Sequence, residues 1–248
     1  MRKASALGPR LAAAAQMLGT AETIWDVGCD HGHLAAALVL SGAAERVIAS
    51  DISASSVAKA NRLVDSLGLE GRITVIRADG LSGYSPSDAF KLVICGMGGE
   101  LIAQLLDGSE AAKSAQLIVM QPMRGEEELR SFLYNNGFGI IDEAVAEEDG
   151  RFYQLIAAKY GEPCEIPDWF PKDHKRFGWV MCEKPDDNVT ALLNSFRSGH
   201  AARLERAMQH SKTPLKLVHE LEAVDSIIAH RASACLCGQQ PSSGGEHE

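Results

Sequence analysis

The chain has 248 residues, of which 46% are hydrophobic, and its net charge is −9. This length and composition allow one full core with a small appendage. No apolar run approaches the roughly 18–20 residues that a membrane-spanning helix needs. The basic N-terminus precedes no apolar block, so we expect no signal peptide. The six cysteines lack the spacing of a disulfide framework, which favours the cytoplasm.

The acidic balance argues against an obvious nucleic-acid binder, but the charges are unevenly distributed. Residues 1–21 carry Arg2, Lys3 and Arg10 without an acid. Between residues 197 and 216, Glu205 is accompanied by five basic residues: Arg197, Arg203, Arg206, Lys212 and Lys216. These basic residues form either solvated helix faces or a phosphate-binding surface, and charge alone leaves both interpretations open.

Helical spacing over residues 7–18 follows Ser5, a suitable capping residue. From there, short apolar runs alternate with helical patterns. The predicted strands are Thr23–Val27, Arg46–Asp51, Ile73–Arg77, Leu92–Cys95 and Leu117–Met120. The predicted helices between them are Leu34–Leu40, Ser55–Leu67, Gly99–Leu106 and Glu126–Asn136. This alternation predicts an α/β protein with a parallel sheet that is covered on both faces.

The pattern changes after Gly137. Phe138–Val145 and Phe152–Tyr160 indicate two consecutive strands, joined by an acidic turn, and hence an antiparallel pair at the sheet edge. Parallel strands followed by such a C-terminal hairpin are typical of the Rossmann-like sheet of class I methyltransferases rather than of two mononucleotide-binding halves.

Beyond residue 160 the composition shifts to an irregular connector, in which Trp169 and Phe170 are expected to pack onto the core. Residues 188–210 and 214–232 then read as two amphipathic helices that form a coiled-coil-like helical hairpin. We therefore expect a methyltransferase domain over residues 1–160, a C-terminal helical hairpin domain over 161–237 and a disordered tail over 238–248.

The segment Asp26-Val-Gly-Cys-Asp-His31 is the most informative part of the chain. A strand that breaks at Gly28 and restarts as a helix presents backbone N–H groups where nucleotide-like ligands bind in α/β sheets. Asp26 and Asp30 flank this loop, and two carboxylates are a poor environment for a pyrophosphate. They suit a cationic ligand with hydroxyl and amino groups, such as S-adenosylmethionine.

Acids also follow the next two strands. Asp51 would accept the ribose hydroxyls with Ile52 beside it, and it lies near the expected offset of ~20 positions beyond Gly28. Asp79 would bind the adenine amino group, and Gly80 would allow close approach. Each acid alone is ordinary turn chemistry, but acids at three successive strand ends predict a cofactor site.

The fourth strand ends in Gly96-Met-Gly-Gly99, where many amino-directed methyltransferases have an Asn/Asp-Pro-Pro-aromatic turn. Three glycines permit a backbone that admits a flat base, although they also fit a strand-to-helix turn without catalytic meaning. Gln121, after the fifth strand, either hydrogen-bonds a base edge or closes its own turn.

A family resemblance rests on these motifs together: Arg10-Leu11, Asp26-Val-Gly-Cys-Asp-His31, Ala49-Ser-Asp51, Asp79-Gly-Leu81, Gly96-Met-Gly-Gly-Glu-Leu-Ile102, Gln121-Pro122 and Gly150-Arg-Phe-Tyr153. They resemble the bacterial tRNA adenine-22 N1-methyltransferase family over residues 7–160, and the helical hairpin matches that family's layout. Departures are Gly32-His-Leu-Ala35, where the family usually has Ala-Tyr-Leu-Pro, and Met123, where it usually has Asn.

The resemblance implies transfer of a methyl group from S-adenosylmethionine to adenine N1 in tRNA. Asp30 is then the catalytic candidate, with the alternative that it only shapes the cofactor loop. The implied cofactor contacts are Arg10, Asp26, Gly28, Asp30, His31, Asp51, Ile52, Asp79, Gly80 and Gly96. The implied substrate contacts are Met97, Gly98, Gly99, Gln121, Arg197, Arg203 and Arg206, and Tyr153 is either a base contact or a core residue.

Other functions stay open. A small-molecule methyltransferase would use the helical hairpin as a lid or dimer contact, and a non-enzymatic adapter would use it as a partner surface. We expect no metal, since no His/Cys/Asp/Glu cluster has ligand spacing. Protein partners are unknown from the sequence.

Overall fold

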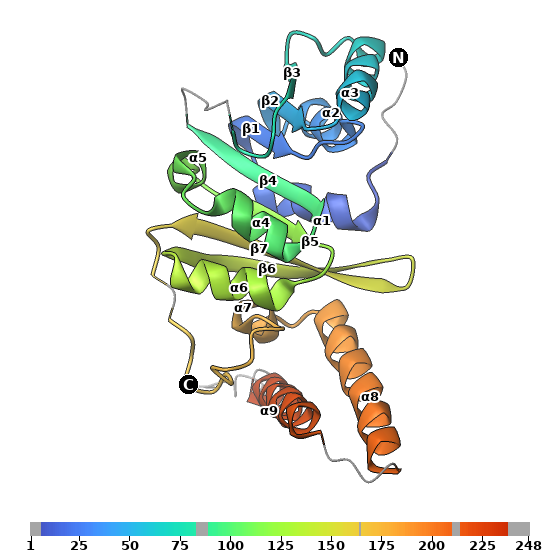
Figure 1. The fold of residues 1–248 in the computed structure, drawn as a ribbon, viewed down its shortest axis with the longest axis vertical. Coiled ribbons are helices and arrows are strands. Elements are labelled where there is room, and N and C mark those ends of the chain that lie inside the picture. The colour runs from blue at the N-terminus through green and yellow to red at the C-terminus, as the bar shows by residue number, and fades with distance from the viewer. Residues whose placement is uncertain (1–5, 83–88, 164, 210–213, 238–248) are drawn as a thin grey trace, which may run out of the picture.

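The structure is a computed structural model that describes residues 6–82, 89–163, 165–209 and 214–237. In this part of the chain the strands form one seven-stranded sheet in the order β3-β2-β1-β4-β5-β7-β6 (Figure 1). The strands are β1 (Ala21–Val27), β2 (Ala44–Asp51), β3 (Ile73–Arg77), β4 (Phe90–Met97), β5 (Ile118–Pro122), β6 (Phe138–Glu148) and β7 (Arg151–Tyr160). The helices are α1 (Pro9–Leu18), α2 (His33–Leu40), α3 (Ala54–Leu67), α4 (Gly99–Leu106), α5 (Glu110–Ser114), α6 (Glu126–Asn135), α7 (Trp179–Glu183), α8 (Asp187–Gln209) and α9 (Leu215–Cys237).

The strand order confirms the predicted Rossmann-like methyltransferase sheet. β1 to β5 pair in parallel, and β7 runs antiparallel to both β5 and β6. The chain builds outward from β1 to β3 and then returns to place β4 on the other side of β1. The carboxyl ends of β1 and β4 therefore meet at the point where the strand order reverses, which is where open α/β sheets bind their ligands.

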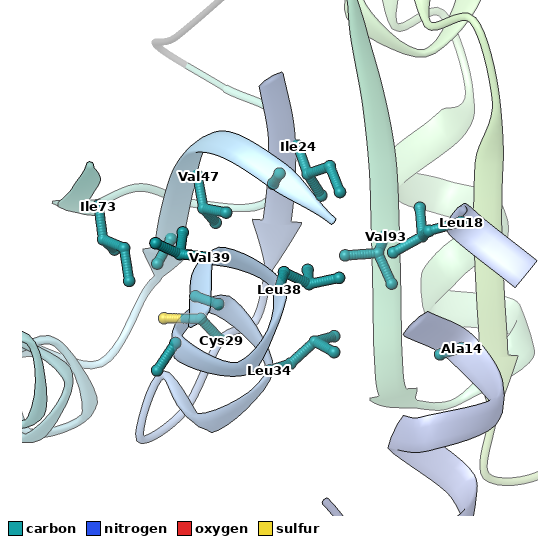
Figure 2. Packing of buried hydrophobic residues seen from close by; sticks show 14 of the residues in the cluster. Ala14, Leu18, Ile24, Cys29, Leu34, Leu38, Val39, Val47, Ile73 and Val93 are labelled. Atoms are coloured by element: carbon teal, nitrogen blue, oxygen red, sulfur yellow. The ribbon is translucent and has the colours of Figure 1, made fainter. Parts of the chain in front are cut away.

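Apolar side chains from alternate positions of the strands fill the core on both faces of the sheet. On one face, α1 and α2 pack against the sheet through a cluster that includes Ala14, Leu34, Leu38 and Val93 (Figure 2). On the other face, Trp25 and its neighbours pack against α4 and α6. Five of the eight residues of α2 are buried, and this close packing on the strands fixes the loop that precedes the helix.

The C-terminal helices lie beyond the β6–β7 side of the sheet (Figure 1). Their cluster joins Val145 of β6 to Phe170 and Phe177 of the connector and to Leu193 and Val224 of the hairpin. Trp169 also packs against this cluster, as expected for the connector.

Several predicted bounds differ from the structure by one or two residues, and three differences are larger. The prediction omits α5 and α7, because five residues are too few for a helical period to show. It ends the last helix at Ala232, whereas α9 continues to Cys237. The predicted strands at residues 138–145 and 152–160 extend further into their turn, to Glu148 and from Arg151. His210 and the tail at 238–248 lie outside the described residues.

Candidate active site

The loop between β1 and α2 is held in a strained conformation against the end of β2. The backbone N–H groups of Gly28 and Cys29 both donate to the carbonyl of Ser50, at 2.8 and 2.9 Å. Asp30 has a positive φ of 47°, which is uncommon for a residue with a side chain. Its side chain is 70% exposed and receives a hydrogen bond from Ser56 at 3.4 Å. The loop therefore presents a carboxylate to solvent at the carboxyl end of the sheet, and uncommon backbone conformations of this kind concentrate at functional sites.

Asp51 at the end of β2 stabilises this loop and the residues that follow β2 through hydrogen bonds from two backbone N–H groups. Its Oδ2 accepts the backbone N–H of Asp30 at 3.1 Å, and its Oδ1 accepts that of Ser53 at 2.8 Å. Ile52 next to it is 58% exposed, so an apolar side chain faces solvent beside a half-buried carboxylate. A polar acceptor beside an exposed apolar surface suits a ribose next to a flat base.

Asp26 is the unusual group of the site. It is buried at 3% exposure in β1, and its Oδ2 has no hydrogen-bond partner among the described residues. Burial raises the pKa of Asp26 to about 7, a backbone hydrogen bond from Ala35 opposes this rise, and the negative charge of Asp51 adds to it. An unpartnered buried carboxylate oxygen is costly, and carboxyl groups with such a raised pKa concentrate at functional sites.

The Gly96–Gly99 turn lies directly over this loop. A Cβ on Gly28 would collide with the Cε of Met97, so the glycine allows Met97 to lie on the loop. The ladder between β4 and β5 shifts register between Cys95 and Met97, which carries the turn out of the sheet. The predicted cofactor loop and the predicted base-binding turn are therefore in contact.

Comparison with known proteins agrees with this geometry. Residues 7–156 match the model of a family described as a methyltransferase domain. The chain belongs to this family. The tRNA (adenine(22)-N(1))-methyltransferase of Bacillus subtilis is 32% identical over 157 residues, which cover 63% of this chain and 66% of that protein, slightly under two thirds of its length.

Solved structures extend the likeness over most of the chain. A proposed tRNA (m1A22) methyltransferase from Streptococcus pneumoniae superposes with a TM-score of 0.79 at 26% identity, over 90% of this chain and 99% of that one. The complex of the Streptococcus pneumoniae protein with S-adenosyl-L-methionine gives a TM-score of 0.77 at 26% identity, with 90% and 99% coverage.

Gln121 closes a turn beside the Gly96–Gly99 turn. Its side chain is fully buried, and its Oε1 accepts from Arg10 Nη1 at 2.6 Å and from the backbone N–H of Gly96 at 3.2 Å. Its Nε2 donates to the carbonyl of Pro122 at 2.6 Å. Of the two predicted roles, this geometry favours the closure of the turn, because the amide has no exposed atom for a base edge.

Arg10 is held in the same network. Its Nε lies 3.2 Å from Glu148 Oε2, and its guanidinium lies 5.7 Å from the ring centroid of Tyr153. Sequence reasoning found Arg10 and Tyr153 but missed Glu148, because an acid in a strongly acidic turn carries no distinguishing signal. The three residues join α1 to the β6–β7 turn beside the Gly96–Gly99 turn.

The remaining predicted contacts lie around the same edge. His31 Nε2 is 3.6 Å from Asp30 Oδ1, and both side chains are partly exposed. Asp79 is exposed, and a Cβ on Gly80 would collide with Leu105, so the backbone there passes close to α4. Gly98 has open space around its Cα among the described residues.

The predicted phosphate contacts on the hairpin separate into two groups. Arg197 Nε is paired with Asp225 Oδ1 at 2.5 Å across the hairpin. Arg203 and Arg206 instead line a cleft of about 540 Å³ between the connector, α8 and α9. Lys216 of the predicted basic stretch also lines that cleft, the structure adds Arg176, and Lys212 lies outside the described residues. We call the cleft lined by Arg176, Arg203, Arg206 and Lys216 the basic cleft.

In the described residues no group of His, Cys, Asp and Glu side chains has the arrangement of a metal site. None of the described helices is both long and apolar enough to span a membrane.

Proposed function

We propose that this chain is an S-adenosylmethionine-dependent methyltransferase that methylates N1 of an adenine in tRNA, at position 22 as named for its relatives. The observation that carries the proposal is the buried, unpartnered carboxylate of Asp26 beneath a loop that also presents Asp30. A tRNA substrate implies that the enzyme works in the cytoplasm.

The residues present fit this cofactor. Asp26 beneath the Gly28 loop would face its cationic methionine end, Asp51 would bind its ribose hydroxyls, and Asp79 with Gly80 and Ile52 would bind its adenine. Arg10 already has two acceptors, so we assign it to shaping the site through Gln121 rather than to direct cofactor contact. When bound, S-adenosylmethionine supplies an electrophilic methyl group on a sulfonium.

Adenine N1 carries an in-plane lone pair, so the protein has no proton to remove before the new N–C bond forms. The Gly96–Gly99 turn would admit the flat base against its backbone. The exposed Asp30 carboxylate would accept a hydrogen bond from the exocyclic amino group and offset the positive charge that the ring acquires. Catalysis then consists of alignment and electrostatic stabilisation.

The basic cleft would hold phosphates of the tRNA. Arg203 and Arg206 extend from α8, and Lys216 extends from the start of α9. Glu220 also lines the cleft, where its Oε2 lies 3.0 Å from His200 Nε2 and its Oε1 lies 4.0 Å from Lys216 Nζ. This leaves Arg176, Arg203 and Arg206 as the main phosphate contacts. Phosphate contacts of this kind position an RNA without reading its sequence.

The test is incubation with methyl-labelled S-adenosylmethionine and bulk bacterial tRNA, followed by nucleoside mapping. The expected product is 1-methyladenosine in tRNA. Cofactor binding with no label in tRNA would refute the RNA substrate and favour the small-molecule methyltransferase, for which no described feature explains the basic cleft.

A second test addresses the RNA contact. Arg203→Glu with Arg206→Glu should weaken tRNA binding at least tenfold and reduce its salt dependence by about one to two charges. Lys59→Glu with Arg62→Glu on α3 is the matched control, because it makes the same charge change at exposed positions elsewhere. Arg197→Ala should have a smaller effect, since Asp225 already neutralises that side chain. Equal tRNA affinity in the cleft variant and the control would exclude the hairpin surface.

A further inference from the structure

The residues that lead into α6 are packed against the Gly96–Gly99 turn. The backbone N–H of Gly99 donates to the carbonyl of Arg124 at 2.7 Å. A Cβ on Gly99 would collide with the carbonyl oxygen of Gly125, so only glycine allows this approach. Any displacement of α6 therefore displaces the Gly96–Gly99 turn.

Arg130 lies about 7–8 Å further along the same helix, at 1.5 Å per residue from Gly125. It is fully buried together with Glu143 of β6. Its Nε and Nη2 lie 2.8 and 2.7 Å from Glu143 Oε1, and Nη2 also donates to Gln154 Oε1 at 2.8 Å. This side of the guanidinium fastens α6 to the sheet.

The other side of the guanidinium holds the connector. Nη1 donates to the carbonyls of Lys175 at 3.2 Å and Arg176 at 2.8 Å. A Cβ on Gly178 would collide with the Glu143 carboxylate, and the Oε2 of that carboxylate accepts the N–H of Met181 at 3.3 Å. The connector is therefore closely packed on the buried ion pair.

The backbone carbonyl of Arg176 is bound by Arg130, and the Arg176 side chain lines the basic cleft. Its guanidinium carbon lies 5.1 Å from the ring centroid of Phe196 on α8, and its side chain is one of the four cations of the cleft. A buried arginine in α6 thus fixes the backbone of a cation in the cleft. The N-terminal end of the same helix packs against the Gly96–Gly99 turn.

We propose that Arg130 is a positioning residue for RNA, which sets the separation between the methyl-transfer site and the basic cleft by holding Arg176 at a fixed distance from the Gly96–Gly99 turn. This rests on the proposed function. A buried ion pair is a poor source of stability by itself, because desolvation offsets much of its attraction. An arginine that bonds two separate chain segments instead supplies geometry.

The test is Arg130→Lys, which keeps a charge for Glu143 but loses the forked donors to the connector. The expected result is a roughly tenfold increase in KM for tRNA with kcat changed less than twofold and cofactor affinity unchanged. Arg72→Lys is the matched control, since Arg72 also donates to two backbone carbonyls, of Glu45 and Ala44, at 2.9 and 2.8 Å. It should leave KM unchanged.

A double-mutant cycle with Arg176→Ala then separates positioning from general damage. If Arg130 acts through Arg176, Arg130→Lys adds little to KM once Arg176 is alanine. Independent, multiplying effects would overturn the proposal, as would a lowered kcat at constant KM, which is what a loss of folded enzyme produces. If Arg130→Lys fails to fold, Gly178→Ala replaces it with the same expected rise in KM, because its Cβ would collide with the Glu143 carboxylate and displace the connector together with the Arg130–Glu143 pair.

The outcomes also distinguish a failure of the proposed function from a failure of the positioning role of Arg130. Absence of methyl transfer to tRNA by the unaltered chain refutes the proposed function. Normal transfer with an unchanged KM in Arg130→Lys refutes the positioning role alone.

Discussion

Replacing Asp26 with asparagine is expected to remove a pH-dependent cost from the fold and to weaken cofactor binding at the same time. The carboxyl group is buried and its folded-state pKa is about 7, against 3.8 for an ordinary aspartate. Between these values the folded chain keeps a proton that the unfolded chain has lost. Stability therefore falls as the pH rises through this window, and the full cost is present above pH 7.

The magnitude follows from the shift. Between pH 5 and the folded-state pKa of about 7, the free energy of unfolding falls by about 1.36 kcal/mol per pH unit. The 2 units therefore correspond to about 2.7 kcal/mol, and little further change is expected up to pH 8. The free energy of unfolding should fall by this amount more in the wild type than in Asp26→Asn. Comparing pH dependences cancels the fixed cost of burying an amide in place of the carboxyl.

The measurement is urea unfolding of both proteins at pH 5, 6, 7 and 8, with Asp65→Asn, an exposed position on α3, as the control. Calorimetric titration at pH 7.5 should also show at least tenfold weaker S-adenosylmethionine binding by Asp26→Asn, because a charge-assisted contact is lost. Parallel plots of unfolding free energy against pH for the wild type and Asp26→Asn would refute the raised pKa of Asp26. Equal cofactor affinity in the two proteins would remove Asp26 from the proposed cofactor site.

Three further predictions follow from particular positions. Asp30→Asn should lower kcat by at least a hundredfold with cofactor affinity nearly unchanged, because asparagine tolerates the left-handed backbone and only the charge is lost; a kcat near the wild-type value would assign Asp30 to the loop alone. Gly99→Ala should destabilise the fold or displace α6, because its Cβ would collide with Gly125, whereas Gly98→Ala should be neutral in thermal unfolding. Burial lowers the pKa of His174 to about 4, so the free energy of unfolding should fall as the pH drops from about 6.5 to 4. His174→Gln should remove this acid-side loss when unfolding is measured over the same pH range.

The strand-to-helix loops were predictable because their signals are local. An apolar strand, a break at Gly28 and a new helical period place the loop, and the acids Asp30 and Asp51 follow at known offsets. The alternation of strands and helices likewise fixes a parallel sheet. These features depend on neighbouring residues, so the chain itself carries the information.

The network around Arg10 could not be predicted in the same way. Arg10 meets Gln121 across 111 positions and Glu148 across 138, and neither pair has a periodic signature. The basic cleft shows the same limit, because Arg176 enters it from an irregular connector. The pairing of Arg197 with Asp225 depends on how α8 and α9 are rotated relative to one another, which composition does not specify.

The charge distribution has a consequence for how RNA approaches the proposed site. Asp30 and Asp51, joined by Asp26 above its pKa of about 7, concentrate negative charge at the carboxyl end of the sheet where the cofactor would bind, and this field repels phosphates. The cations that attract phosphates lie in the basic cleft, on a separate part of the chain. The RNA backbone would therefore be held at the cleft, while a single neutral base, splayed from its stack, enters between the loop and the Gly96–Gly99 turn. Because the methylated base becomes a cation, the carboxylates that repel the backbone also stabilise the product ring as it forms.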